Sequence, residues 1–461
     1  MRIIIEARLE DAQVGAASAE ATTVEVVERQ DGSIANLALT LAEGRALLAK
    51  VQSILVSQQT ASWTASQVAC HRCGSKLAHT DSRLIVMRTV FGKVKVPSPR
   101  LWACGCTGKP GERRRSASPL CSALPQRVTP ELQYLQAKWA AHPSYRWATE
   151  LLQEVLPLDK AISLGSTRRR ILTVGGALDA QIERDIAAQP NYIDRDRVRE
   201  STSIGCVSVD SAWLRFSSSS KSRKAVRDLA QIKSPLAMKL EQARHVNIVA
   251  GRATFTNRTS RLYAYVHKEV QSAAARLDQF LTSSGVSPEE RVTVISDDAG
   301  EFGTAVEGSR LVRGRILDWF HIAMKFKAAE NSVFGSATIA PLERDVIQTE
   351  LDHAKWLTWH GKGRQSVARV KALDTSLLAR NGYEGSALWW NLRRLSGYIK
   401  SNAGSLVNYG ARYRKGLPIS SSIAESAVNQ VVSHRMAKHQ QMRWTDAGAH
   451  RLAQVSVIRK H

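Results

Sequence analysis

Two apolar runs in the sequence each end in an aspartate, and this pattern constrains the fold more than any other. Cys206-Val-Ser-Val-Asp210 and Val292-Thr-Val-Ile-Ser-Asp297 are typical of buried strands. A third acid, Glu425, opens a helix-like stretch far downstream. Carboxylates that a sheet directs into one cleft can hold two divalent cations about 3.5–4 Å apart. The three acids therefore predict a metal-dependent site assembled from distant parts of the chain.

The charge balance favours a polyanionic partner. The 461 residues carry 65 Lys and Arg against 41 Asp and Glu, a net charge of +24. Cations placed on phosphates release condensed counterions, so such an excess indicates DNA or RNA. A merely soluble basic surface is the alternative. The length predicts two to four domains, and the 43% hydrophobic content is that of a globular protein.

Three features of the sequence bear on the cellular compartment: its first residues, its apolar runs and its cysteine count. The start, Met-Arg-Ile-Ile-Ile-Glu, has charges at once, so we expect no signal peptide. No run of about 18 apolar residues occurs, so we expect no membrane span. Six cysteines are too few for a disulfide scaffold in a chain of this length, which favours a reducing, cytoplasmic compartment.

The order of predicted elements after residue 203 is typical of an RNase H-like domain. Strands are expected at 204–216, 245–255 and 263–266, a helix at 269–281, and strands at 292–295 and 315–317. In that arrangement the first and fourth strands are neighbours, which would bring Asp210 beside Asp297. Asp298 is the alternative for the second acid. The long interval before Glu425 requires an insertion, which we expect to be helical and to cover 325–418.

Two cysteine pairs flank a predicted β-hairpin and indicate a zinc ribbon. Four thiolates at such spacing suit tetrahedral Zn²⁺. The expected ligands are Cys70, Cys73, Cys104 and Cys106. His71 and His79 are alternative ligands, and incidental buried or free cysteines are the alternative interpretation. Cys121 and Cys206 have no nearby cysteine in the sequence, and we expect both in the core.

Two amphipathic segments, Tyr145 to Val155 and Ser166 to Leu178, are joined by Leu-Pro-Leu-Asp-Lys and are typical of a helix-turn-helix. Recognition helices place their N-terminal residues against base edges. The natural contacts here are Arg168, Arg169 and Arg170. An all-helical packing domain with a solvated arginine face is the alternative.

Further cations gather near the acids in the sequence. The segment from Ser217 to Arg244 is polar and basic, and phosphate contacts of this kind position a duplex without reading its sequence. The basic residues expected to bind DNA near Glu425 are Arg435, Lys438 and Arg443. Four tryptophans of the expected insertion are candidates for stacking on an unpaired base, or else are core residues: Trp356, Trp359, Trp389 and Trp390.

Several motifs resemble bacterial insertion-sequence transposases of the DDE type, in the group related to the eukaryotic Mutator elements. The most specific is Glu425-Ser-Ala-Val-Asn-Gln-Val-Val-Ser-His-Arg-Met-Ala-Lys-His-Gln-Gln-Met-Arg-Trp444. Asp318-Trp-Phe-His321-Ile, the contexts of the first two acids and the Cys-rich region with Val96-Pro-Ser-Pro-Arg-Leu match as well. The resemblance covers most of the chain.

The resemblance implies a catalytic triad of Asp210, Asp297 and Glu425 that binds Mg²⁺ or Mn²⁺. Related transposases have Cys-x-x-His where this chain has Asp318-x-x-His321. These two residues are therefore expected to be accessory, with His321 contacting DNA or orienting the cleft, or else serving as a core histidine. The implied activity is hydrolysis at the ends of an insertion sequence, followed by strand transfer into target DNA. A structure-selective nuclease of RNase H-like fold and a non-catalytic DNA-binding protein derived from a transposase are the alternatives.

The sequence therefore predicts a modular α/β protein with an RNase H-like core. Its partners would be double-stranded DNA, at the transposon ends and the target, and a second copy in a homodimer or higher oligomer, in the cytoplasm and nucleoid of a bacterium. The expected parts are an N-terminal strand and helix segment (1–60), a zinc ribbon (61–125), a helix-turn-helix region (126–200), the first part of the core (201–324), a helical insertion (325–418), and the last core helix with the tail (419–461).

Overall fold

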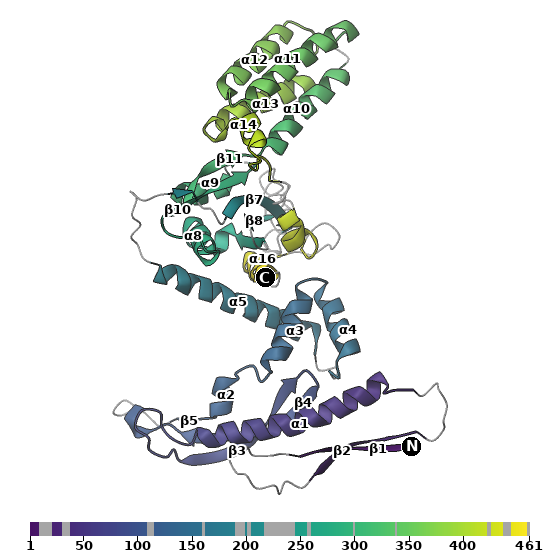
Figure 1. Cartoon of the computed structure of the whole chain (residues 1–461), viewed down its shortest axis with the longest axis vertical. Coiled ribbons are helices and arrows are strands. Elements are labelled where there is room, and N and C mark those ends of the chain that lie inside the picture. Colours follow the sequence, from purple (N-terminus) through teal and green to yellow (C-terminus); the bar gives the residue numbers. More distant parts are fainter. Residues whose placement is uncertain are drawn as a thin grey trace, which may run out of the picture. The chain divides into compact units, whose positions relative to one another are not determined.

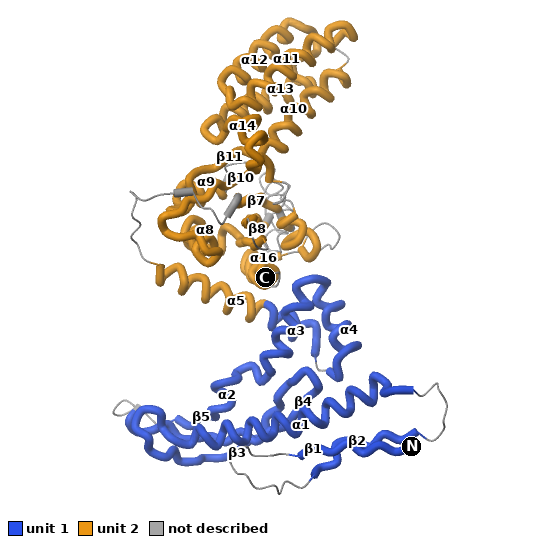
Figure 2. Tube along the Cα trace, in the orientation of Figure 1, with its two compact units in different colours: residues 1–171 blue, residues 172–461 orange. Residues whose placement is uncertain are grey.

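The computed structural model describes the chain apart from residues 9–20, 30–36, 108–114, 159–161, 190–198, 201–203, 216–244, 256–259, 298–299, 337–338, 422–425, 437–443 and 459–461. The chain divides into two compact units, Met1–Ile171 and Leu172–His461 (Figure 2). The boundary between them falls inside helix α5 (Leu164–Ala188).

The first unit begins with a hairpin and a long helix. β1 (Arg2–Ala7) pairs antiparallel with β2 (Thr22–Glu28), and α1 (Leu41–Ser66) follows. Thr40 caps α1, because its hydroxyl accepts from the Glu43 N–H while the Glu43 carboxylate accepts from the Thr40 N–H. The helix expected between Leu37 and Gln58 is confirmed, but this capping box starts it four residues later.

A three-stranded antiparallel sheet carries the two cysteine pairs. It consists of β3 (His79–Thr89), β4 (Gly92–Trp102) and β5 (Ser116–Ala117), with the 3₁₀ turn η2 (Gly105–Thr107) and helix α2 (Pro119–Ala123) beside it. Alternate residues of β3 and β4 are buried, as the sequence pattern predicts. The core of this region contains Ile85, Met87, Val94, Val96, Leu120 and Val56 of α1.

Three helices follow the sheet: α3 (Pro130–Ala140), α4 (Tyr145–Val155) and α5. Their apolar core includes Val128, Leu132, Leu152, Leu158 and Ile162. The hydroxyls of Thr149 and Thr167 lie 2.9 Å apart in this interior and join α4 to α5. The helix predicted from Tyr145 to Val155 has these bounds in the structure, as α4. The helix predicted from Ser166 to Leu178 is longer in the structure, where α5 runs from Leu164 to Ala188.

The second unit contains a six-stranded mixed sheet, with strand order β11-β10-β7-β8-β9 and β6 paired to β10 (Figure 1). β7, β8 and β9 are antiparallel neighbours, whereas β10 is parallel to both β7 and β11. The strands are β6 (Arg199–Glu200), β7 (Ile204–Arg215), β8 (His245–Phe255), β9 (Arg261–Val266), β10 (Glu290–Ser296) and β11 (Val312–Leu317). The mixed α/β class expected from the sequence is confirmed at this level.

Different helices cover the two faces of this sheet. α8 (Ala273–Ser283) and α9 (Gly300–Gly308) share a core with Val207, Val209 and Val294. α9 was not expected, because it is short and begins and ends at glycine. Cys206 and Ile295, which point the other way, share a core with the helices that follow β11.

Those helices are α10 (Trp319–Phe334), α11 (Pro341–Trp359), α12 (Gly363–Leu377), α13 (Ala387–Ser401) and α14 (Tyr409–Arg414), with the 3₁₀ turn η5 (Ala403–Ser405). The expected helical region is confirmed, but it starts at Trp319 rather than 325. One apolar core runs from Cys206 in the sheet to Tyr409, so these helices extend the core of the sheet. A π-helical turn, η6 (Asn429–Ser433), and α16 (Asp446–Ile458) complete the unit.

A buried cluster of charges attaches α5 and α16 to this unit. Arg276 of α8 is almost fully buried and pairs with Asp179 at 2.6 Å and Glu183 at 3.0 Å. His450 of α16 bonds Asp179 at 2.8 Å and accepts from the Val266 N–H at 3.1 Å. Burial would raise the pKa of Asp179, but His450 and Arg276 lower it to about 2.

None of the described helices has the length and apolar character needed to cross a bilayer.

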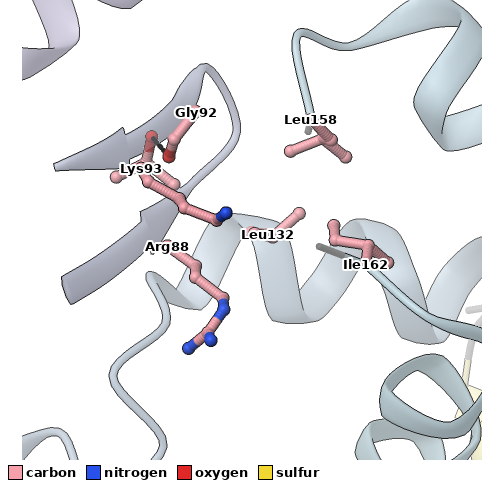
Figure 3. Close-up of a pocket in the computed structure, with 7 residues that line it drawn as sticks. Arg88, Gly92, Lys93, Leu132, Leu158 and Ile162 are labelled. Atoms are coloured by element: carbon pink, nitrogen blue, oxygen red, sulfur yellow. Dashed lines mark hydrogen bonds between the residues drawn. The ribbon is translucent and has the colours of Figure 1, made fainter. Parts of the chain in front are cut away.

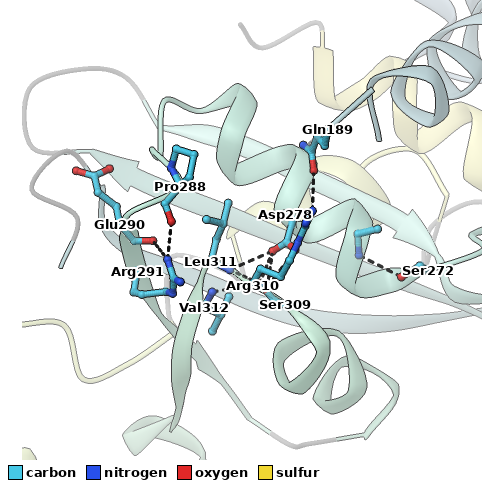
Figure 4. A network of polar contacts seen from close by, with 11 residues as sticks. Gln189, Ser272, Asp278, Pro288, Glu290, Arg291, Ser309, Arg310, Leu311 and Val312 are labelled. Carbon is cyan, nitrogen blue, oxygen red and sulfur yellow. Dashed lines mark hydrogen bonds and ion pairs between the residues drawn. The ribbon is translucent and has the colours of Figure 1, made fainter. Parts of the chain in front are cut away.

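The turn that leads into β11 is held by one buried carboxylate, Asp278 (Figure 4). It accepts from the Ser309 hydroxyl at 2.5 Å and from the backbone N–H groups of Arg310, at 3.1 Å, and Leu311, at 3.3 Å. The Arg310 side chain also reaches Gln189 at 3.5 Å. Asp278 thus fixes the position at which β11 starts beside β10.

We expect Asp278→Ala to destabilise the protein by about 2–4 kcal/mol, because it leaves several buried donors without an acceptor. The midpoint of chemical denaturation measures this effect. Asp352→Ala, which removes an exposed carboxylate from α11, is the control and should change stability by less than about 0.5 kcal/mol. Equal effects of the two substitutions would contradict the role given to Asp278.

Candidate active site where β7 and β10 meet

Asp210 lies in β7, and Asp297 is the first residue after β10, the parallel neighbour of β7. Ile295 lies opposite Ser208 and Ser296 opposite Val209, so the next pair in this register is Asp297 with Asp210. Paired strands run about 4.8 Å apart, so the backbone at Asp297 follows directly on a position that lies beside Val209, the neighbour of Asp210. The adjacency of these strands, expected from the sequence, is confirmed. Asp210 lies inside β7, not at its end. The pairing of β7 with β10 stops at Val209, whereas its pairing with β8 continues to Arg215.

The two aspartates also share one face of the sheet. Side chains alternate along a strand, so Asp210 lies on the face of Cys206, and Asp297 on the face of Ile295. Cys206 and Ile295 belong to the same apolar core as Ile322 of α10. Both acids therefore lie on the face that α10 covers, and each side chain is half-buried.

Asp318 fixes the start of α10 at this edge. Its backbone N–H donates to the carbonyl of Ser296 at 3.0 Å, and its carboxylate caps α10 by accepting from the Phe320 N–H at 2.8 Å. The Asp318 side chain is fully buried. Asp318 is therefore an orienting residue and has no surface to offer a ligand.

His321 bonds Asp318 and is close enough to the two aspartates to feel their charges. Its Nδ1 is 2.9 Å from the Asp318 carboxylate, and 36% of its side chain is exposed. The hydrogen bond to Asp318 raises the pKa of His321, and the charges of Asp297 and Asp210 raise it further, while burial opposes them. Burial would raise the pKa of Asp318, but its bonds to His321 and Ser421 lower it. The hydrogen bond between Asp318 and His321 therefore shifts the two pKa values in opposite directions.

Glu425 falls outside the described residues, but both of its flanks contact this region. On one side, the Ser421 hydroxyl donates to the Asp318 carboxylate. On the other, Gln430 accepts from Arg252 at 2.9 Å and donates to the Ser426 hydroxyl at 3.2 Å. Arg252 stands opposite Ser208, two positions from Asp210 on the same face. The described residues on either side of Glu425 thus contact Asp318 and Arg252, near the two aspartates.

Tyr398 is a site residue that the sequence did not reveal. Its hydroxyl donates to the backbone carbonyl of Asp297, and Lys325 lies 4.3 Å from the centre of its ring. Tyr398 belongs to α13, a hundred residues from Asp297, and no local motif marks it. This hydrogen bond ties the backbone at Asp297 to helix α13.

The structure corrects one predicted DNA contact. Arg435 is only 1% exposed, and its guanidinium lies 5.4 Å from the centre of the Trp444 ring. It is therefore an interior residue that packs on an aromatic ring, and it cannot reach a phosphate from this position. Asp298, Lys438, Arg443 and almost the whole basic segment from Ser217 to Arg244 lie outside the described residues.

The tryptophans of the helical region divide into two groups. Trp359 is a core residue, because its ring packs 4.6 Å from that of Trp319 and also contacts Tyr409. Trp389 is partly buried against the same core. Trp356 and Trp390 are about half exposed, and each has a basic side chain near its ring.

The four predicted cysteine ligands form one cluster. The Sγ atoms of Cys70, Cys73, Cys104 and Cys106 all lie within 4.8 Å of one another, with two pairs at 3.5 Å. Tetrahedral zinc with Zn–S bonds of about 2.3 Å requires sulfurs roughly 3.8 Å apart. His71 and His79 are exposed and outside the cluster. The four thiols are thus close enough to bind one metal ion.

Local hydrogen bonds prepare the first cysteine pair for a metal. Bonds with Ser75 lower the pKa of Cys73 to about 6, and backbone N–H groups of the same turn lower that of Cys70. Hydrogen bonding with the other thiols, chiefly Cys104, raises the pKa of Cys106 to about 12. A bound cation would remove this competition by stabilising all four thiolates. Of the other two cysteines, Cys206 is buried as expected, whereas Cys121 is only half-buried.

The three predicted recognition arginines are not equivalent. Arg168 and Arg169 are exposed on the first turns of α5, whereas Arg170 is half-buried. Burial, together with the charges of Arg88 and Arg169, lowers the pKa of Arg170. The triplet therefore presents two side chains to solvent and turns the third toward β3.

No protein-family model matches this chain, and no curated protein is significantly similar to it.

We expect Cys73→Ser and Cys104→Ser each to abolish stoichiometric metal binding, because three thiolates and a hydroxyl make a much weaker site. Metal content per chain after dialysis measures this effect. Cys121→Ser is the control, since Cys121 lies outside the cluster, and it should keep the metal content of the unsubstituted protein. Full metal content in Cys73→Ser would rule out the four-thiol site.

Proposed function

We propose that the chain is a DDE transposase that binds the ends of an insertion sequence and catalyses metal-dependent cleavage and strand transfer. The observation that carries this proposal is the placement of Asp210 beside Asp297, on one face of the mixed sheet. The strand order, with the first and fourth long strands parallel and adjacent, supports an RNase H-like core. The helices from α10 to α14 are then the insertion of that core.

The donor set suits a hard divalent cation. Two adjacent carboxylates repel each other unless a cation neutralises them, and Mg²⁺ or Mn²⁺ prefers carboxylate oxygens. Asp210 and Asp297 would hold the ion, with Glu425 as the third ligand. When bound, the metal would polarise the phosphodiester and activate the attacking hydroxyl.

The surrounding residues position these acids. Asp318 and Ser296 join the start of α10 to the end of β10, and Tyr398 holds the backbone of Asp297. His321, oriented by Asp318 and with a raised pKa, would partly offset the repulsion between the aspartates when it is protonated. His321 also has enough exposure to contact a DNA phosphate near the scissile bond.

The first unit would bind DNA. A net charge of +24 and the exposed arginines of α5 favour a nucleic-acid partner, and zinc is the metal that best fits four thiols. Two element ends must meet for strand transfer, so at least a dimer on DNA is proposed. The proposed site of action is the bacterial nucleoid in the cytoplasm.

The central test is a cleavage and strand-transfer assay with duplexes that carry the inverted repeats flanking the coding region. We expect Asp210→Asn, Asp297→Asn and Glu425→Gln each to lower both products roughly 100-fold or more, since a metal ligand supplies several kcal/mol of transition-state stabilisation. Asp352→Asn, on the exposed face of α11, is the matched control and should keep its activity.

The outcomes separate the related functions. Metal-dependent cleavage of branched DNA without strand transfer would indicate a structure-selective nuclease. Binding to the repeats with neither reaction would indicate a non-catalytic DNA-binding protein. Unchanged strand transfer in Asp210→Asn would refute the assignment of the acids.

A further inference from the structure

An open groove runs between α11 and α12, two neighbouring helices joined by a short turn (Figure 1). It holds about 450 Å³, and the buried residues Ile347, Leu373 and Leu377 form its apolar floor. A hollow at the β3–β4 hairpin, by contrast, holds about 10 Å³, which is room for little more than one water molecule (Figure 3). Of these two hollows, the groove is the one that can receive the side chains of another protein.

The α11 side of the groove carries large apolar side chains that project into solvent. Leu342 is 90% exposed and Val346 is 65% exposed, and the two lie one turn apart on the same face of α11. Val346 also lines the groove. Single exposed apolar residues are normal on a protein surface, but neighbouring ones beside an apolar floor are typical of a surface that another protein covers.

The α12 side of the groove is made of small residues. Ala368, Ala372 and Ser376 are all exposed, and their four-residue spacing places them on one face of α12. Ala372 and Ser376 line the groove directly. One side of the groove therefore carries projecting side chains, and the other side leaves room for such side chains.

Two ion pairs connect the two sides, and their charges are ordered. Glu343 of α11 bonds Arg380, which follows α12, at 2.5 and 2.6 Å. Glu350 of α11 pairs with Arg369 of α12 at 3.2 Å. In both pairs the acid lies on the α11 side and the base on the α12 side. A chain with a net charge of +24 tends to repel its own copies, whereas these pairs bring no net charge to the groove.

We propose that the α11–α12 surface binds the same surface of a second copy of this chain in a two-fold symmetric dimer. A two-fold axis along the groove exchanges its two sides, so α11 of each copy lies over α12 of the other. Val346 then enters the space above Ala372 and Ser376 of the second copy. Glu343 lies over Arg380 of the second copy in the same way, so each acid faces a base. The surface is complementary to itself in both shape and charge, which a partner of another kind does not require.

The size of this surface sets the expected strength of the dimer. The two helices are ~22–28 Å long and pack about 10 Å apart, so the shared face covers roughly 500 Å² per copy, near the lower limit for a specific interface. We therefore expect a weak dimer that forms at micromolar protein concentrations. This inference goes beyond the proposed function, because such a dimer requires neither DNA nor the metal site.

The test is sedimentation velocity of the full-length chain over micromolar concentrations, without DNA or Mg²⁺. We expect Val346→Asp to weaken self-association by about tenfold or more, because each dimer would bury two unpaired carboxylates. Ala372→Trp fills the receiving side and should have a similar effect. Val155→Asp is the matched control, since Val155 is a 59% exposed valine of α4 in the first unit, and it should leave self-association unchanged. Circular dichroism checks that all three variants are folded.

An exchange of charges tests the orientation of the two copies. Glu343→Arg combined with Arg380→Glu keeps the ion pair within each chain, and two exchanged chains remain complementary to each other. A mixed dimer of an exchanged and an unsubstituted chain would bring like charges together at these positions. We expect both chains to self-associate equally and the mixed dimer to form roughly threefold less often than random pairing gives, as energy transfer between labelled chains would measure.

Three results would overturn the proposed dimer. A chain that stays monomeric over the whole concentration range would exclude a second copy as the occupant of the groove. A dimer that Val346→Asp and Ala372→Trp leave intact would show that the interface lies elsewhere. Equal losses for Val155→Asp and Val346→Asp would show non-specific association. A dimer sensitive to Val346→Asp in a chain that cleaves no DNA would support this interface and count against the transposase, so the two proposals can fail separately.

Discussion

The parallel pairing of β10 with β7 is the constraint on which the second unit depends. It sets Asp297 next to Asp210, and because side chains alternate, it also decides that both lie on the face covered by α10. A slip of one residue would send one carboxylate to the opposite face, into the apolar core beneath α8 and α9. The Asp278 network and the bond between Asp318 and Ser296 fix the two ends of β11 beside β10, on the other side of β10 from β7.

The first unit uses a different source of stability. Its sheet has three strands and a small apolar core, so a cross-link contributes a larger share of the stability there than in the second unit. The four thiols bring both ends of the hairpin to one point, so a bound metal ion would supply the missing cross-link. The Arg88 to Thr129 backbone bonds then carry that rigidity to the three helices.

Local sequence patterns predict much of the fold, but some elements and residue roles could not be predicted from them. The strand at 245–255 and the helix at Tyr145–Val155 have the predicted bounds, because apolar periodicity and N-capping act over a few residues. α9 has no such signal, since it is short and flanked by glycine. Tyr398 and the buried Arg435 could not be foreseen, because contacts with residues far along the chain define their roles.

The amino-acid sequence by itself determined the basic charge, the four-cysteine spacing, and the presence of aspartates at the ends of apolar runs. Each of these is a property of a short segment. Only the tertiary structure decided the full strand order of the sheet, that Asp318 is buried as a helix cap, and that Arg170 is half-buried whereas Arg168 and Arg169 are exposed. The physical reason is that strand order and side-chain direction depend on burying both faces of a sheet at once, which no single segment encodes.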